Sequence, residues 1–281
     1  MTGQRRRGRL LLVVALTLFA IGASIASASA TKANGRVAVN GHKLNLQCRG
    51  KGSPAVVFES GLGGSSIDWS DEITSLAKAH VRVCAYDRYG LGASDVPTTR
   101  ITRTVEDLVA EKHDLLATAG VKGPYILVGH SIAGLIDRYY AKVYPNQVAG
   151  AVMIDTAPDD WNLQIHQDTF DETPVVGLSV ATAASTLRSS DSLGKRPLVV
   201  IRADANWAMS VAPRKYWDRH QRALVKISRN SIFLIAKGTD HYIPIESPKL
   251  VAKSIQLVVT SARRHKHLPT CRAAKLPGAR C

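Results

Sequence analysis

The sequence has 281 residues, of which 45% are hydrophobic, and its formal net charge at pH 7 is +15. A chain of this length and apolar content can bury a full-sized core, and we expect one large domain. The positive charge does not indicate nucleic-acid binding, because the basic residues are not interleaved with aromatic ones and match no nucleic-acid-binding motif.

The first thirty residues have the pattern of a secretory signal. Four arginines between Arg5 and Arg9 precede an apolar run from Leu10 to Ile21, and Ala28-Ser29-Ala30 offers a small-residue cleavage site. The apolar run is shorter than the roughly 20 residues that a spanning helix needs. We therefore expect cleavage near Ala30 and export as a secreted, periplasmic or cell-envelope protein with a remaining charge of +11. An uncleaved membrane anchor is the alternative.

Short apolar segments between turn-forming residues predict eight strands. The first two are separated by Asn40-Gly41, a strong hairpin signal, and helical patterns separate most of the others. Parallel strands need crossover connections, so this alternation predicts an α/β fold with a mostly parallel eight-stranded sheet and helices on both faces. The strands are expected at residues 36–39, 43–48, 55–59, 81–86, 125–128, 151–154, 198–201 and 232–235, and the helices at 69–79, 104–119, 131–145, 217–227 and 247–261.

Two segments stand apart from this alternation. Residues 156–197 form a connection after the sixth strand that is long for a compact domain, and Trp161, Phe170 and Val176 give it apolar surface. We expect a cap over a pocket there. Residues 263–281 form a basic tail, which is either a solvated end or a weak contact with an anionic cell surface.

The segment Gly129-His130-Ser131-Ile132-Ala133-Gly134 lies between a predicted strand and a predicted helix. It is close to the G-x-S-x-G nucleophile elbow, in which a tight turn projects a serine hydroxyl above the sheet. The departure is Ala133, where the motif has its second glycine, with glycine delayed to Gly134. The motif and its position predict Ser131 as a nucleophile.

Together with three further segments, this motif resembles the α/β-hydrolase superfamily, and especially its secreted, bacterial, esterase-like serine hydrolases. The segments are Phe58 to Gly64, Tyr86 to Asp95 and Gly238 to His241, and all follow the family's order. The resemblance covers roughly Val37 to Val259. It implies a hydrolase domain over residues 31–262, with the cap at 156–197. The turn after Tyr86 is interpreted as structural.

The resemblance also assigns roles around Ser131. His241 stands where the family's catalytic histidine follows the last strand, and His130 is interpreted as a packing residue. The acid that orients His241 is either Asp155 or Asp204, because each follows a strand at which the family places it; Asp155 is favoured for its position directly at a strand end.

The oxyanion donors implied by the resemblance are the backbone amides of Leu62 and Ile132, although many relatives carry His-Gly where this chain has Ser60-Gly61. Ser131 would attack an acyl carbonyl, and water would release the acid from an acyl-enzyme. This reaction needs no metal and no organic cofactor. Its partner is a small-molecule acyl substrate, most simply a carboxylic ester.

Four cysteines in an exported chain favour disulfides over free thiols or metal ligands. In the family's sheet order the second strand lies beside the fourth, which implies a Cys48–Cys84 bond and leaves Cys271–Cys281 in the tail. Two other functions remain open at this point: a peptidase or acyltransferase of the same fold, and a ligand-binding protein with little turnover.

Overall fold

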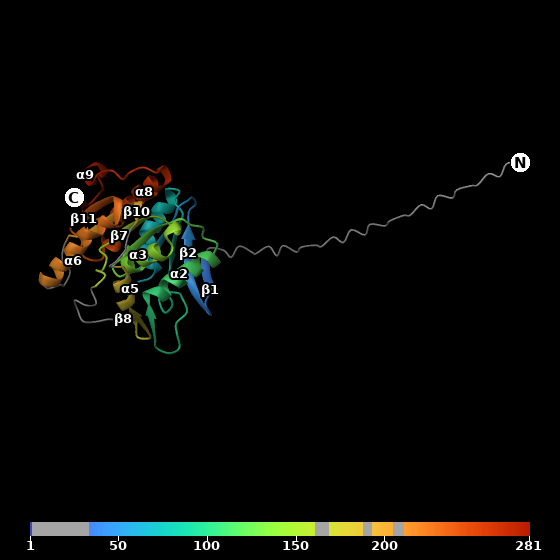
Figure 1. Ribbon diagram of the computed structural model, residues 1–281. Coiled ribbons are helices and arrows are strands. Elements are labelled where there is room, and N and C mark those ends of the chain that lie inside the picture. The colour runs from blue at the N-terminus through green and yellow to red at the C-terminus, as the bar shows by residue number, and fades with distance from the viewer. Residues whose placement is uncertain (2–33, 161–168, 188–192, 205–210) are drawn as a thin grey trace.

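The computed structural model describes Met1 and residues 34–160, 169–187, 193–204 and 211–281 (Figure 1). The expected signal segment, apart from Met1, and the cap residues 161–168, with Trp161, and 188–192 lie outside the described residues. No helix within the described ranges combines the length and the apolar content that crossing a bilayer would require.

Within these ranges, nine strands form one mixed sheet in the order β1-β2-β4-β3-β6-β7-β10-β11-β12. The six strands from β4 to β11 are mutually parallel, whereas β1, β2 and β12 run antiparallel to their neighbours. The predicted α/β class is therefore confirmed. The sheet has nine strands instead of the expected eight, because a short strand from the basic tail pairs with β11. The strands are β1 (Asn34–Val39), β2 (His42–Arg49), β3 (Ala55–Glu59), β4 (Val83–Tyr86), β6 (Tyr125–His130), β7 (Val148–Ile154), β10 (Gly194–Ala203), β11 (Ser228–Ala236) and β12 (Ala279–Arg280).

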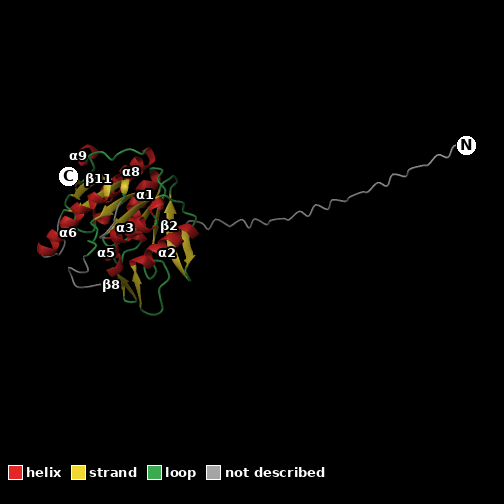
Figure 2. Cartoon of the chain, in the orientation of Figure 1, coloured by secondary structure: helices red, strands yellow, loops and turns green. Residues whose placement is uncertain are grey.

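Helices cover both faces of this sheet (Figure 2). Alternate residues of each buried strand face opposite sides, so Ile126 and Val128 of β6 belong to one apolar core and Leu127 belongs to the other. The core around Ile126 is closed by η1 (Ser66–Trp69), α1 (Ser70–Lys78) and α8 (Pro248–Arg264), and the core around Leu127 by α2 (Val105–Thr118), α3 (Ala133–Val143) and α6 (Val211–Leu224).

The start of α2 shows how the sequence sets a helix boundary. Thr104 Oγ1 accepts a hydrogen bond from the Asp107 amide at 3.1 Å, and the Thr104 amide donates to Asp107 Oδ2 at 2.8 Å. This reciprocal capping satisfies backbone donors that the first helical turn cannot use. The helix ends before Gly120, whose φ of +66° suits glycine.

The cap segment contains a second, smaller sheet. Its described part holds β8 (Thr169–Thr173), β9 (Val176–Ser179) and α5 (Ala181–Leu187), and β9 pairs with both β8 and β5 (Ile101–Thr104). In Figure 1, β8 lies on the opposite side of the molecule from α8 and α9 (Cys271–Ala274). The cap is thus tied to the loop after β4 by strand pairing, which the sequence did not predict.

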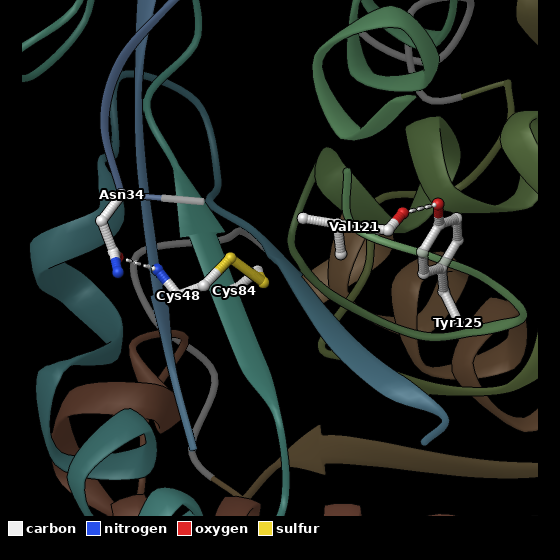
Figure 3. The surroundings of a disulfide bond; sticks show 5 residues. All are labelled: Asn34, Cys48, Cys84, Val121 and Tyr125. Atoms are coloured by element: carbon white, nitrogen blue, oxygen red, sulfur yellow. Dashed lines mark hydrogen bonds between the residues drawn. A yellow bond between two sulfur atoms is a disulfide. The ribbon is translucent and has the colours of Figure 1, made fainter. Parts of the chain in front are cut away.

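Both expected disulfides are present. Cys48 and Cys84 are directly opposite each other on β2 and β4, with 4.1 Å between their Cα atoms (Figure 3). The Cys48 amide also donates to Asn34 Oδ1 of β1 at 2.6 Å (Figure 3). Cys271 and Cys281 close the chain around α9 and β12. The tail is therefore folded against the sheet edge.

Candidate active site

Ser131 lies at the sharp turn between β6 and α3, and its backbone is strained. Its φ is +57°, a left-handed conformation that costs a non-glycine residue roughly 1–3 kcal/mol and persists only when the surroundings enforce it. The enforcing bonds are the Ser131 amide to the Ile154 carbonyl and the Ala157 amide to the Ser131 carbonyl, both 3.0 Å. The strained turn leaves Ser131 partly exposed above the sheet.

The two glycines around Ser131 allow this turn to pack. A Cβ at Gly129 would lie 2.9 Å from the backbone of Ala133, and a Cβ at Gly134 would lie 2.1 Å from Thr156 Cγ2. Ala133 itself is fully buried with its methyl group. The β6 strand thus approaches α3 at Gly129, and α3 approaches Thr156, just after β7, at Gly134, whereas position 133 accommodates the methyl group of alanine.

His241 follows β11 and precedes the short helix α7 (Ile243–Glu246). Its Nδ1 is 2.8 Å from Asp155 Oδ2, and both side chains are buried. Asp155 Oδ1 accepts two further bonds at 3.2 Å, from the Ala203 amide and from Trp217 Nε1. Three partners therefore fix the Asp155 carboxylate in place and orient the His241 ring, and Trp217 is a contributor that the sequence gave no reason to select.

Asp204, the other acid considered, has different partners. Its Oδ2 accepts a hydrogen bond from the Gly238 amide at 3.2 Å, and its Oδ1 forms an ion pair with Arg280 of β12. The structure therefore brings Asp155 to His241 and leaves Asp204 in a contact with the tail.

Ser131 and His241 line the same cavity, which has a volume of about 430 Å³. The wall opposite is the loop after β3, residues 60–64, in which a Cβ on Gly61 would lie 3.4 Å from Ser131 Cβ. Leu62 also lines the cavity, and Ile132 caps the start of α3, so both predicted amides belong to segments that flank Ser131.

His130 packs against His241 inside this site. Its Nε2 lies 2.8 Å from the His241 carbonyl oxygen, and the two rings are 4.6 Å apart. Burial, together with the nearby His241 ring, lowers the pKa of His130 to about 4. His130 is therefore neutral at pH 7 and donates to the backbone of His241, which holds the loop after β11 against the nucleophile turn.

Comparisons with known proteins identify the family of the chain. The sequence model of the alpha/beta hydrolase fold matches residues 54–194. The chain belongs to this family. The described part of this family member contains no group of three or more His, Cys, Asp or Glu side chains placed to hold a metal ion.

Several known proteins are similar in sequence to this chain, and the chain covers a different share of each one's length. The uncharacterized protein YqjL of Bacillus subtilis (strain 168) is 26% identical over 227 residues, which is 77% of this chain and 88% of YqjL. The protein efuK of Hormonema carpetanum is 34% identical over 131 residues, 44% of this chain, so the chain spans only 19% of efuK. RutD of Yersinia enterocolitica, whose assigned name is that of a carbamate hydrolase, is 37% identical over 41% of each chain.

Among solved structures, the enol-lactonase from Burkholderia xenovorans LB400 is similar with a TM-score of 0.58. The match covers 80% of this chain and 99% of the enol-lactonase, at 19% sequence identity. Identity at this level establishes the shared fold and leaves the substrate open.

Proposed function

We propose that this family member is a serine hydrolase that cleaves a carboxylic ester through an acyl-enzyme on Ser131. The observation that carries the proposal is the 2.8 Å bond between Asp155 and His241 beside a serine in a strained left-handed turn. Backbone strain of this kind concentrates at functional sites, and a buried carboxylate that holds a histidine ring is the arrangement that activates a serine.

The residues of the site act in sequence in the proposed reaction. Asp155 holds His241 Nδ1–H, which leaves Nε2 as the base that takes the proton from Ser131 Oγ as it attacks the ester carbonyl. The amides of Leu62 and Ile132 bind the oxyanion, and His241 then gives its proton to the departing alcohol. His241 then takes a proton from water, which attacks the acyl carbonyl, and returns that proton to Ser131 Oγ as the acyl–oxygen bond breaks, so that the carboxylic acid and free Ser131 are released.

The same proposal includes export of the protein. Two disulfides account for all four cysteines, and such bonds persist in oxidising compartments. Cleavage near Ala30 is tested by the intact mass of the protein recovered from cell fractions, which should begin at Thr31. Weak contact of the tail, residues 263–281, with an anionic surface is tested by salt-sensitive sedimentation with anionic vesicles.

The activity test uses p-nitrophenyl acetate, butyrate and palmitate with the wild type and three variants. Ser131→Ala should abolish turnover and labelling by a fluorophosphonate, and Asp155→Asn should lower the rate by about a thousandfold or more. Asp204→Asn is the matched control, and its rate should stay within about threefold of the wild type. Equal, negligible rates in all four proteins would instead support the ligand-binding alternative.

A further inference from the structure

A buried arginine, Arg88, binds two carbonyl oxygens of the loop after β3. Arg88 Nη1 donates to the Ser60 carbonyl at 2.7 Å, and Arg88 Nη2 donates to the Gly61 carbonyl at 2.7 Å. The Gly61 carbonyl and the Leu62 amide belong to one planar trans peptide, in which C=O and N–H point in opposite directions. By binding this carbonyl, Arg88 turns the Leu62 N–H away from itself.

Arg88 is almost fully buried, at 2% exposure, and all five of its N–H donors are used. Besides the two carbonyls, Nη1 donates to Glu59 Oε1 at 2.8 Å, while Nη2 and Nε bind the two carboxylate oxygens of Glu172. A buried guanidinium that loses one of its two carboxylates is left with N–H donors that have no acceptor, and it must find another contact for them. The guanidinium orientation therefore depends on both carboxylates.

The two carboxylates come from different parts of the fold. Glu59 ends β3, whereas Glu172 lies on β8 in the cap, 84 residues after Arg88. The cap backbone also abuts the same loop, because a Cβ on Gly63 would lie 3.3 Å from the Glu172 carbonyl oxygen. The cap therefore contacts the loop that carries Leu62 in two ways, through the ion pair of Glu172 with Arg88 and through direct packing against Gly63.

Glu59 is anchored on its other side and cannot follow Arg88 if the guanidinium turns. Its second oxygen, Oε2, accepts from Tyr86 and, at 3.1 Å, from Lys112 Nζ, which also donates to Asp137 of α3 at 2.5 Å. Although burial alone would raise the pKa of Glu59, the charges of Lys112 and Arg88 lower it. Glu59 is a fixed charge, so Glu172 is the partner whose position can vary with the cap.

We propose that Arg88 and Glu172 are positioning residues that couple the cap to the oxyanion hole: Glu172 fixes the guanidinium that orients the Gly61–Leu62 peptide. This inference rests on the proposed function. An oxyanion donor acts on the transition state more than on the bound ester, so disturbing it lowers kcat and leaves KM nearly unchanged. The cap then contributes to the rate itself as well as to substrate choice.

Neighbouring residues of β8 provide a matched test. Glu172 faces buried Arg88, whereas the adjacent Asp171 is exposed and pairs with exposed Arg100. Glu172→Gln, Glu172→Asp and Asp171→Asn are compared by kcat and KM on p-nitrophenyl butyrate, and by inhibition with an alkyl trifluoromethyl ketone, whose adduct with Ser131 carries an oxyanion. Hydrogen–deuterium exchange of a peptide spanning residues 60–64 reports on the loop without any turnover.

For Glu172→Gln, kcat should fall about tenfold with KM within about twofold, because a displaced donor costs part of the hundredfold or more that its removal costs. The ketone should bind about tenfold more weakly, and exchange in residues 60–64 should rise. Glu172→Asp should recover part of each change, and Asp171→Asn should show none.

Unchanged exchange in residues 60–64, or a loss of kcat without any loss of ketone affinity, would overturn the coupling while the serine hydrolase proposal stands. A wild type that shows neither turnover nor fluorophosphonate labelling would overturn both.

Discussion

A cavity lies at each end of the strands of the central sheet, and the two cavities are lined by different kinds of residue. At the carboxyl ends of the strands, a cavity of about 430 Å³ holds Ser131 and His241. At the amino ends, a larger hollow of about 630 Å³ is lined by exposed basic residues such as Lys195 and Lys266 and contains none of the predicted catalytic residues. Size alone would select the amino end. The cavity at the carboxyl ends of the strands is nevertheless the candidate active site, because it contains a serine with a strained backbone and a histidine bound to a buried carboxylate, and these groups can transfer a proton.

The largest expected difference between the two ends is in turnover. His241→Ala removes the base and should lower kcat/KM on p-nitrophenyl butyrate by about a thousandfold or more. His267→Ala, at an exposed side chain of the amino-end hollow, should leave kcat/KM within about twofold. Similar losses in the two variants would contradict the assignment of chemistry to the carboxyl end.

His130, in the cavity at the carboxyl ends of the strands, should also make the free energy of unfolding depend on pH. Because the pKa of buried His130 is lowered to about 4, the unfolded chain takes up a proton there between pH 6.5 and 4 while the folded chain does not. The free energy of unfolding should therefore fall by up to about 3 kcal/mol as the pH drops through this window. Urea denaturation of His130→Gln should show a smaller decrease.

Exposed His267 is the control for this experiment. His267→Gln should keep the pH dependence of the wild type between pH 6.5 and 4. Partly buried His220, whose pKa is lowered to about 4 by desolvation and by Arg138, should account for part of the decrease that remains in His130→Gln. Parallel curves for the wild type and His130→Gln would refute the assignment to His130.

The space around a glycine also differs between the two ends of the sheet. In Gly134→Ala the new methyl group meets Thr156 Cγ2 at 2.1 Å, and we expect a loss of about 2 kcal/mol in unfolding free energy together with reduced turnover. In Gly194→Ala, at the amino-end hollow, no atom lies within 4 Å, so only the φ of +62° is strained and the loss should be about 1 kcal/mol. Turnover that falls equally in the two variants would argue against a packed nucleophile turn.

The smallest expected effect concerns Asn230, a buried residue of the amino-end hollow. Its Oδ1 accepts from the Leu268 amide at 2.7 Å, and its Nδ2 donates to Ser261 Oγ at 3.3 Å. Asn230→Ala should lower the unfolding free energy by about 1 kcal/mol, because it removes bonds that hold the chain after α8. kcat/KM should stay within about twofold, and a larger decrease would show that the two ends are coupled.

The sequence predicted the features that local patterns encode. Strand-turn-helix order around Ser131, the histidine after the last long strand and the capping of α2 depend on neighbours within a few residues. Of the two acids considered, Asp155 is the one that contacts His241. Local patterns left both acids open, because the contact that distinguishes them joins Asp155 to His241, 86 residues later in the sequence. Asp204 instead pairs with Arg280 of β12, 76 residues after it.

Contacts between distant segments were missed for the same reason. Nothing in the sequence near Glu172 indicates that it meets Arg88, and the pairing of β9 with β5 joins segments that are more than seventy residues apart. Lys112 did carry a signal, because it occupies an apolar-face position of α2 beside Leu108 and Leu115, where a charge needs a buried partner.

β12 has a consequence for how this protein meets other copies of itself. A terminal strand of a sheet offers unpaired amides and carbonyls that can recruit a strand from another molecule. Here Ala279–Arg280 pairs with β11, the Lys237 amide donates to the Gly278 carbonyl at 2.7 Å, and the Cys271–Cys281 bond ties this segment down. Reduction of that bond would release the segment and expose the edge of β11, so we expect self-association through this edge to increase under reducing conditions.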